Sequence, residues 1–208
     1  MKNTLKYAIV LCLLFAFTGL QGQIKFGAKA GLNLSTMSLK YGGISLSPKT
    51  LIGFNVGVIS DISLGKSLSL QPGIFFSTKG SKFKVGAGTE TYEMTWAPTY
   101  IEVPVNVLYN IDLSVTKLFI YAGPYFAYGI GGKIKETGYG SYDISYGSGT
   151  DDDQKPFDIG VNVGAGVNLS GFLISLQYGL GIANLAPSKE NEADLKNRTF
   201  SISVGYLF

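Results

Sequence analysis

Hydrophobic and polar residues alternate along most of the chain from residue 24 to the end. A period of two is typical of a β-strand that has one apolar face. The pattern is clearest in 157–169, where the apolar odd positions oppose Asp158, Gly160, Asn162, Gly164, Gly166 and Asn168. It predicts eight strands, at 24–34, 51–60, 67–79, 99–111, 117–131, 157–169, 172–183 and 199–208.

The polar faces of these segments indicate what the apolar faces contact. They carry mainly Gly, Ser, Asn and Gln, whereas a face exposed to water normally carries many Lys and Glu. Small polar residues fit the crowded interior of a narrow barrel. Segments of about ten residues also have the length of a tilted strand that crosses a bilayer. The alternative is a soluble barrel with inward apolar faces that bind an apolar ligand.

The links between the segments alternate in length. Residues 35–50, 80–98, 132–156 and 184–198 form long links, and residues 61–66, 112–116 and 170–171 form short ones. Barrels of the outer membrane have short periplasmic turns and long external loops. The fold class predicted is therefore all-β, an eight-stranded antiparallel up-and-down transmembrane β-barrel with both chain ends in the periplasm.

The first 22 residues are predicted to be a secretory signal peptide, and 23–208 the barrel domain. Lys2 and Lys6 precede an apolar run over 7–17 that is too short to span a membrane. An uncleaved N-terminal anchor is the alternative. The only cysteine, Cys12, lies in this run, so the processed chain is expected to contain no disulfide. Without Lys2 and Lys6 it has 15 basic and 14 acidic residues, which gives no reason to expect nucleic-acid binding.

Several polar and charged residues have the parity of the lumen face. An eight-stranded barrel is just wide enough for its side chains to fill it, and an unpaired charge there is strongly disfavoured. We therefore expect Glu102 to pair with Lys29, which lies at a similar estimated depth, and Asp158 to lie beside Lys79 nearer the external rim. The predicted lumen network consists of Lys25, Lys29, Lys79, Glu102, Asn106, Tyr125, Asp158, Asn162 and Gln177.

Prolines and aromatic residues add detail to this picture. Pro72, Pro104 and Pro124 fall in three consecutive strands, and each removes one ladder donor, so bulges or a kink are predicted there. Lipid-facing aromatic residues gather near strand ends, as in the girdles of membrane barrels, although composition alone is an alternative cause. The predicted periplasmic rim contains Tyr109, Phe172, Tyr206 and Phe208; the outer rim contains Phe76, Tyr128, Phe157 and Phe200, with Trp96 just above.

The chain resembles the small outer-membrane β-barrel proteins often described as porin-family proteins, related to PorT. The motifs "KFGAKAGLNLS", "YIEVPVNVLY", "FIYAGPYFAYGI" and "SISVGYLF" carry this resemblance over the whole mature chain. It implies a location in the outer membrane of a Gram-negative bacterium. The final Phe208, with Tyr206, looks like the aromatic ending that such barrels present to their assembly machinery.

The chain has no histidine, which excludes Ser-His-Asp and Cys-His catalysis and histidine metal sites. We expect no catalytic residue, metal or cofactor. Asp151, Asp152 and Asp153 form an acidic run that contacts a cation such as Ca²⁺ or, more simply, is solvated. Tyr139, Tyr142 and Tyr146 belong either to an adhesive surface or to a strand extension.

Two functions follow from the sequence. The first is a structural barrel with a filled lumen that displays four external loops for adhesion, envelope integrity or assembly. The second is a narrow porin-like channel for small solutes or ions. Expected partners are membrane lipid and lipopolysaccharide, the barrel-assembly machinery through Phe208, and an envelope or surface protein.

Overall fold

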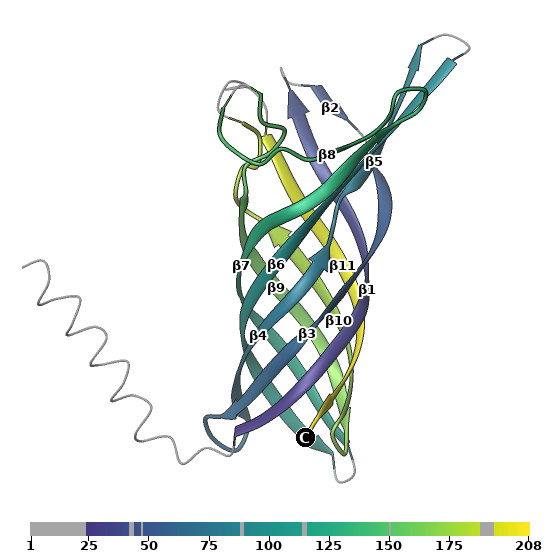
Figure 1. Cartoon of the computed structure of the whole chain (residues 1–208). Coiled ribbons are helices and arrows are strands. Elements are labelled where there is room, and N and C mark those ends of the chain that lie inside the picture. Colours follow the sequence, from purple (N-terminus) through teal and green to yellow (C-terminus); the bar gives the residue numbers. More distant parts are fainter. Residues whose placement is uncertain are drawn as a thin grey trace, which may run out of the picture.

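The computed structural model describes residues 24–41, 44–46, 48–87, 90–113, 116–149, 151–187 and 194–208. The predicted signal peptide, residues 1–22, lies outside them. None of the described residues belongs to a helix long and apolar enough to cross a membrane. The described strands are β1 (Ile24–Tyr41), β2 (Ile44–Leu46), β3 (Lys49–Ser63), β4 (Leu68–Thr78), β5 (Ser81–Ala87), β6 (Glu90–Leu113), β7 (Thr116–Glu136), β8 (Gly140–Asp143), β9 (Phe157–Leu169), β10 (Phe172–Gly181) and β11 (Asp194–Leu207) (Figure 1).

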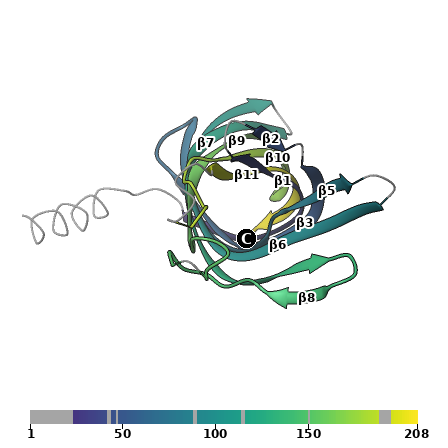
Figure 2. The same ribbon diagram turned by 90° about the horizontal axis from the view of Figure 1, so that it is seen from above.

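Eight of the described strands form a closed antiparallel ring, in the order β1, β11, β10, β9, β7, β6, β4 and β3. Pairing of β1 with β3, from Ile24 opposite Ile62 to Ser35 opposite Leu51, closes it. The view along the axis shows the ring directly (Figure 2). The start of β1 and the C-terminus lie at the end with the short connections (Figure 1), which we call the turn end; the opposite end is the loop end. The predicted eight-stranded barrel is confirmed.

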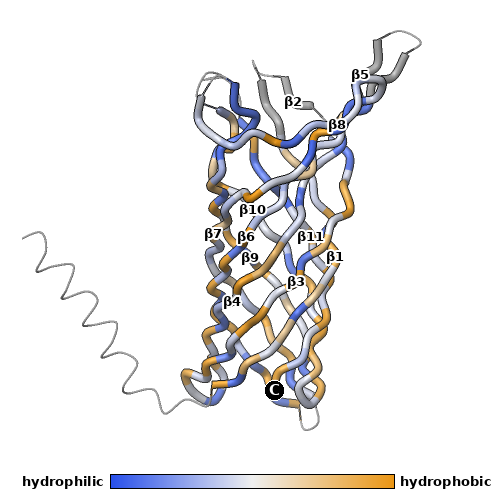
Figure 3. The backbone as a smooth tube through the Cα atoms, in the orientation of Figure 1, coloured by the Kyte–Doolittle hydropathy of each residue, from blue (hydrophilic) through white to orange (hydrophobic). Residues whose placement is uncertain are grey.

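Alternation along the strands separates an outer apolar surface from the lumen. In β9, Phe157, Ile159, Val161 and Val163 are between 38% and 64% exposed, whereas Asp158 is fully buried. The backbone tube shows hydrophobic and hydrophilic residues alternating along the barrel wall (Figure 3). The apolar side chains therefore face outward, where lipid covers them, and the alternative with inward apolar faces is wrong.

The strands continue beyond the predicted segments at the loop end. β6 begins at Glu90 rather than at residue 99, and β7 ends at Glu136 rather than at residue 131. β5 pairs with the extension of β6, and β8 with that of β7. Much of the predicted loop 80–98 is therefore strand. Apolar alternation stops where lipid ends, but backbone pairing continues in water, so the pattern underestimates strand length.

The prolines interrupt the ladder without changing its register. Paired residues of β3 and β4 stop at Ile59 opposite Gly73 and resume at Ile62 opposite Leu70, leaving Pro72 unpaired with β3. Similar gaps lie beside Pro104, between β4 and β6, and beside Pro124, between β6 and β7. No residue is inserted at these points, so of the predicted bulges or kink the bulges are wrong, and the ladder is interrupted at each of the three prolines.

The register shift between β6 and β7 lies nearer the loop end. Thr99 pairs with Gly131 and Tyr100 with Gly129, so Ile130 is an extra residue on β7. Such a bulge reverses the alternation beyond it. Tyr128 is exposed below the bulge, Ile130 is exposed within it, and Lys133 is exposed above it.

Aromatic side chains on the outer wall contact one another at both ends. At the turn end, Phe172 lies 4.8 Å from Tyr206, whose ring lies 5.6 Å from Phe208, measured between centroids. Nearer the loop end, the ring centroids of Tyr128 and Phe157 are 5.0 Å apart. Trp96 does not join this outer set, because it packs against a buried cluster at the loop end. Trp96 lies opposite Ile134, above Tyr128 as predicted, but its side chain does not face outward.

Candidate functional site

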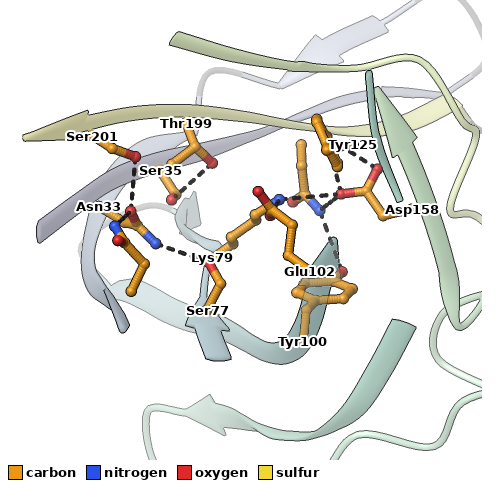
Figure 4. Close-up of polar contacts among 12 residues, drawn as sticks. Asn33, Ser35, Ser77, Lys79, Tyr100, Glu102, Tyr125, Asp158, Thr199 and Ser201 are labelled. Atoms are coloured by element: carbon orange, nitrogen blue, oxygen red, sulfur yellow. Dashed lines mark hydrogen bonds and ion pairs between the residues drawn. The ribbon is translucent and has the colours of Figure 1, made fainter. Parts of the chain in front are cut away.

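The middle of the lumen contains a buried group of charges centred on Lys79, which follows the end of β4. Its Nζ lies 2.6 Å from Oε2 of Glu102 on β6 and 3.6 Å from Oδ2 of Asp158 on β9. All three side chains are less than a tenth exposed. The ammonium also lies 4.3 Å from the ring centroid of Tyr125. Lys79 thus compensates two carboxylates that have left water (Figure 4).

The predicted partner of Glu102 is wrong, because Lys79 occupies that place instead of Lys29. The Lys29 ammonium lies 5.6 Å from the ring centroid of Tyr121. Among the described residues, no carboxylate lies within 4 Å of it. The similar depth estimated for Lys29 did not identify the partner, because β4 pairs directly with β6, with Ser77 opposite Tyr100, and this register brings Lys79 beside Glu102. The predicted proximity of Asp158 to Lys79 is confirmed at 3.6 Å.

Hydrogen bonds hold Asp158 in this group. The Tyr125 hydroxyl donates to Oδ2 of Asp158 over 3.2 Å, and Nδ2 of Asn197 donates to the same oxygen over 2.9 Å. Nδ2 of Asn197 also donates to the Tyr100 hydroxyl over 3.3 Å. Asn197 falls in the predicted loop 184–198, and Tyr100 is absent from the predicted network. The lumen parity that Tyr100 shares with Glu102 is the signal that identifies it.

A second polar group surrounds Asn33 on β1. Its Oδ1 accepts from Nδ2 of Asn55 over 2.7 Å and from Oγ of Ser201 over 2.8 Å. Its Nδ2 donates to Oγ of Ser77 over 3.1 Å and to the Thr78 carbonyl over 2.9 Å. One amide thereby joins four strands across the lumen (Figure 4).

The remaining predicted lumen residues occupy different depths. Gln177 accepts a hydrogen bond from the Tyr121 hydroxyl over 3.2 Å. Asn106 and Asn162 are 5% and 1% exposed and line a cavity of about 40 Å³ beside Lys29. This volume holds roughly three water molecules. Lys25 is exposed at the turn end, where it lines a separate mouth of about 470 Å³, so it does not belong to the central network.

An apolar layer fills the lumen toward the turn end. We call it the floor; its buried residues are Ile59, Phe75, Leu108, Phe119, Tyr121, Leu173 and Leu207. The predicted polar lumen is therefore wrong at this end. The signal lies in the sequence, because apolar residues occupy both parities near several strand ends, as in Val107-Leu108 and Tyr206-Leu207-Phe208. Inward glycines make room for the rings: a Cβ on Gly164 would lie 2.4 Å from the Tyr121 ring.

Residues from outside the ring close the loop end. We call Tyr146 and Gln154, which lie on the connection between β8 and β9, the plug. A Cβ on Gly129 would lie 2.2 Å from the Tyr146 ring, and the Tyr146 hydroxyl donates to the Gly131 carbonyl over 2.9 Å. Gln154 is fully buried and accepts from Nε1 of Trp96 over 2.9 Å. The plug thus packs against the inner side of the wall.

Two of the three adjacent aspartates shape the same connection. Oδ2 of Asp152 accepts from the backbone N–H of Gly149 over 2.6 Å, and Oδ2 of Asp153 accepts from the N–H of Ser145 over 2.9 Å. Among the described residues, no group of three or more His, Cys, Asp or Glu side chains is arranged to hold a metal ion. These carboxylates therefore serve as local acceptors that fold the connection behind the plug.

Comparisons with known proteins agree with this architecture. The family described as outer membrane protein beta-barrel domain matches residues 19–186. OprG from Pseudomonas aeruginosa is 10% identical, with a TM-score of 0.52 and 90% of this chain and 97% of that chain covered. Ail of Yersinia pestis is 16% identical (TM-score 0.43; 89% and 99% covered), and the Neisserial surface protein NspA 12% (TM-score 0.45; 88% and 97% covered). No curated protein sequence matches the chain. The likeness to OprG shows the fold.

Proposed function

Since the chain belongs to the outer membrane protein beta-barrel domain family and is located in the outer membrane of a Gram-negative bacterium, we propose that it is a closed structural barrel that displays its external loops, and not a channel. The short turns face the periplasm, as in other outer-membrane barrels. The loop end then faces outward.

The observation that carries the proposal is the filled lumen. The floor places seven buried, mostly apolar side chains across the periplasmic half of the barrel. Above it, the central cavity of about 40 Å³ holds only a few waters. Gln154 and Tyr146 then occupy the loop end. A solute would meet three successive obstructions, and a hydrated ion would have to lose water against the apolar floor.

The external extensions support a role in display. β6 and β7 stay paired beyond the lipid-facing band as far as Met94 opposite Glu136. β5 and β8 widen this sheet on either side (Figure 1). Pairing on both sides makes the extension rigid, which reduces the entropy lost when a partner binds. We propose an envelope or surface protein as that partner, and assembly of the barrel through the exposed terminal Phe208.

Conductance in a planar lipid bilayer tests this function. The wild-type protein, reconstituted beside a known porin as reference, is expected to give no steady current steps. The variant Phe75→Ser, Phe119→Ser, Gln154→Gly opens both the floor and the plug and is expected to conduct. Phe126→Ala and Phe172→Ala, which remove outward-facing rings, serve as matched controls.

Folding of each protein is checked by heat-modifiable gel migration before the recording. Steady single-channel steps from the wild-type protein, at an amplitude unchanged between preparations, would contradict the proposal and establish the narrow channel in its place.

A further inference from the structure

Lysine side chains gather on the outer face of the sheet that extends beyond the barrel. Lys49 of β3 pairs directly with Lys82 of β5, Lys82 pairs with Thr95 of β6, and Thr95 pairs with Lys135 of β7. Residues directly opposite one another in an antiparallel pair point to the same face of the sheet. These residues therefore form one row across four strands, and Lys133 lies on the same face, two residues from Lys135.

Burial shows that this face points away from the barrel interior. Phe83 and Ile134, the neighbours of Lys82 and Lys135 along the chain, are only 7% and 1% exposed. Lys133 and Lys135 are exposed. The extra residue Ile130 produces this arrangement, because it reverses the alternation on β7 just above the lipid-facing Tyr128.

The row lies just above the apolar, outward-facing wall of the barrel. Lys133 follows Ile130 by three residues, which is about 10 Å along a strand. The aromatic pair of Tyr128 and Phe157 marks the upper part of the apolar wall just below. A lysine side chain at this position extends toward the polar part of the outer leaflet, where its stem can lie along apolar surface.

The charges of the row are only partly compensated by the protein. Lys49 directly opposite Lys82 is a like-charge pair, which destabilises an antiparallel sheet. Oε1 of Glu93 lies 3.8 Å from Nζ of Lys82, and Asp143 pairs with Lys133 across the ladder. Four lysines thus face two carboxylates. An anionic ligand over the row would relieve the repulsion.

We propose that Lys49, Lys82, Lys133 and Lys135 bind the phosphate groups of lipopolysaccharide in the outer leaflet. Ammonium groups donate charge-assisted hydrogen bonds to phosphate oxygens, and such bonds are stronger than neutral ones. The strand spacing separates Lys82 from Lys135 by about 10 Å, so the row can contact more than one phosphate of the same head group. The inference requires the loop end to face outward, and it holds whether or not the lumen conducts.

Binding of lipopolysaccharide to the full-length mature protein in phosphatidylcholine nanodiscs tests the inference. The measurements compare wild type, Lys82→Gln/Lys135→Gln and a control, Lys25→Gln/Lys66→Gln, which removes two exposed lysines at the turn end. A lysine near an anionic lipid surface strengthens binding about fivefold, so the first double variant is expected to bind roughly 25-fold more weakly. The control is expected to bind like wild type, and Lys82→Arg/Lys135→Arg to retain most of the affinity.

Two further arms identify the chemistry that is recognised. Enzymatically dephosphorylated lipopolysaccharide is expected to bind the wild-type protein as weakly as intact lipopolysaccharide binds Lys82→Gln/Lys135→Gln. Phosphatidylglycerol is expected to bind the wild-type protein more weakly than lipopolysaccharide does. Equal binding by wild type and Lys82→Gln/Lys135→Gln, undiminished binding after dephosphorylation, or equal affinity for phosphatidylglycerol would each overturn the assignment. Gel migration confirms that each variant is folded, and the single substitutions, each about fivefold weaker, decide the matter if the double variant does not fold.

Discussion

Replacing either of two lumen lysines by methionine should have very different effects on stability. Lys79 contacts Glu102 at 2.6 Å and Asp158 at 3.6 Å. Lys29 occupies the same lumen, but no carboxylate of the described residues lies within 4 Å of its ammonium. Methionine preserves most of the side-chain length in both cases. The comparison therefore isolates the ionic contribution.

The expected magnitude follows from what each substitution leaves behind. Lys79→Met leaves two buried carboxylates without a cation, and removing one partner of a buried ion pair costs about 3–5 kcal/mol. That loss lowers the equilibrium constant for folding by at least about two orders of magnitude. Lys29→Met leaves no carboxylate of the described residues unpaired, because none lies within 4 Å of the Lys29 ammonium. We therefore expect its free energy of unfolding to stay within about 1 kcal/mol of wild type.

Equilibrium unfolding in urea, with the protein in phospholipid vesicles, measures both values. Trp96 is the only tryptophan of the chain, so its fluorescence reports a single site at the loop end, and heat-modifiable gel migration gives an independent signal. The double variant Lys79→Met/Glu102→Gln removes one of the stranded charges and is expected to recover part of the loss. If Lys29→Met were as destabilising as Lys79→Met, the assignment of Lys79 as the partner of Glu102 would be refuted.

Two other substitutions test how the loop end is closed. Gly129→Ala places a methyl group against the Tyr146 ring and is expected to lower the free energy of unfolding by about 1–3 kcal/mol. At Gly131 a Cβ meets no atom within 4 Å, so Gly131→Ala should be close to neutral in the same urea titration. Gln154→Leu removes the acceptor for Trp96 Nε1. It is expected to lower the free energy of unfolding by about 1–3 kcal/mol and to change the fluorescence emission of Trp96. An unchanged emission spectrum would show that this contact does not form.

The sequence predicts the wall of the barrel well because a repeating physical rule governs it. Every strand that crosses lipid needs apolar residues at alternate positions. Segments such as 157–169 therefore reveal both the strand and which of its side chains face lipid. Above the membrane this rule no longer applies. Residues 90–98 of β6 are strand in the structure, but their sequence does not alternate in this way, so the prediction missed them.

The interior is harder to predict, because parity gives the side on which a residue lies but not its depth. Lys29 and Lys79 both have lumen parity, and the order and register of the strands decide which one meets Glu102. The position of Gln154 is harder still, because it reaches the lumen from a connection whose path has no periodic signal. By contrast, the floor was predictable in principle from residues such as Leu108, where both parities become apolar.

The composition of the floor links the sealing of the barrel to the last step of its assembly. Its residues come from six strands and include Ile59 on β3 and Leu207 at the end of β11. Contacts so distant in sequence form late, because the whole intervening chain must first be placed. Pairing of β1 with β11, which joins the first strand to the last, also brings Leu207 into position. In the closed barrel that we propose, closing the ring and shutting the passage across the membrane are a single event, so we expect a partly assembled barrel to leak.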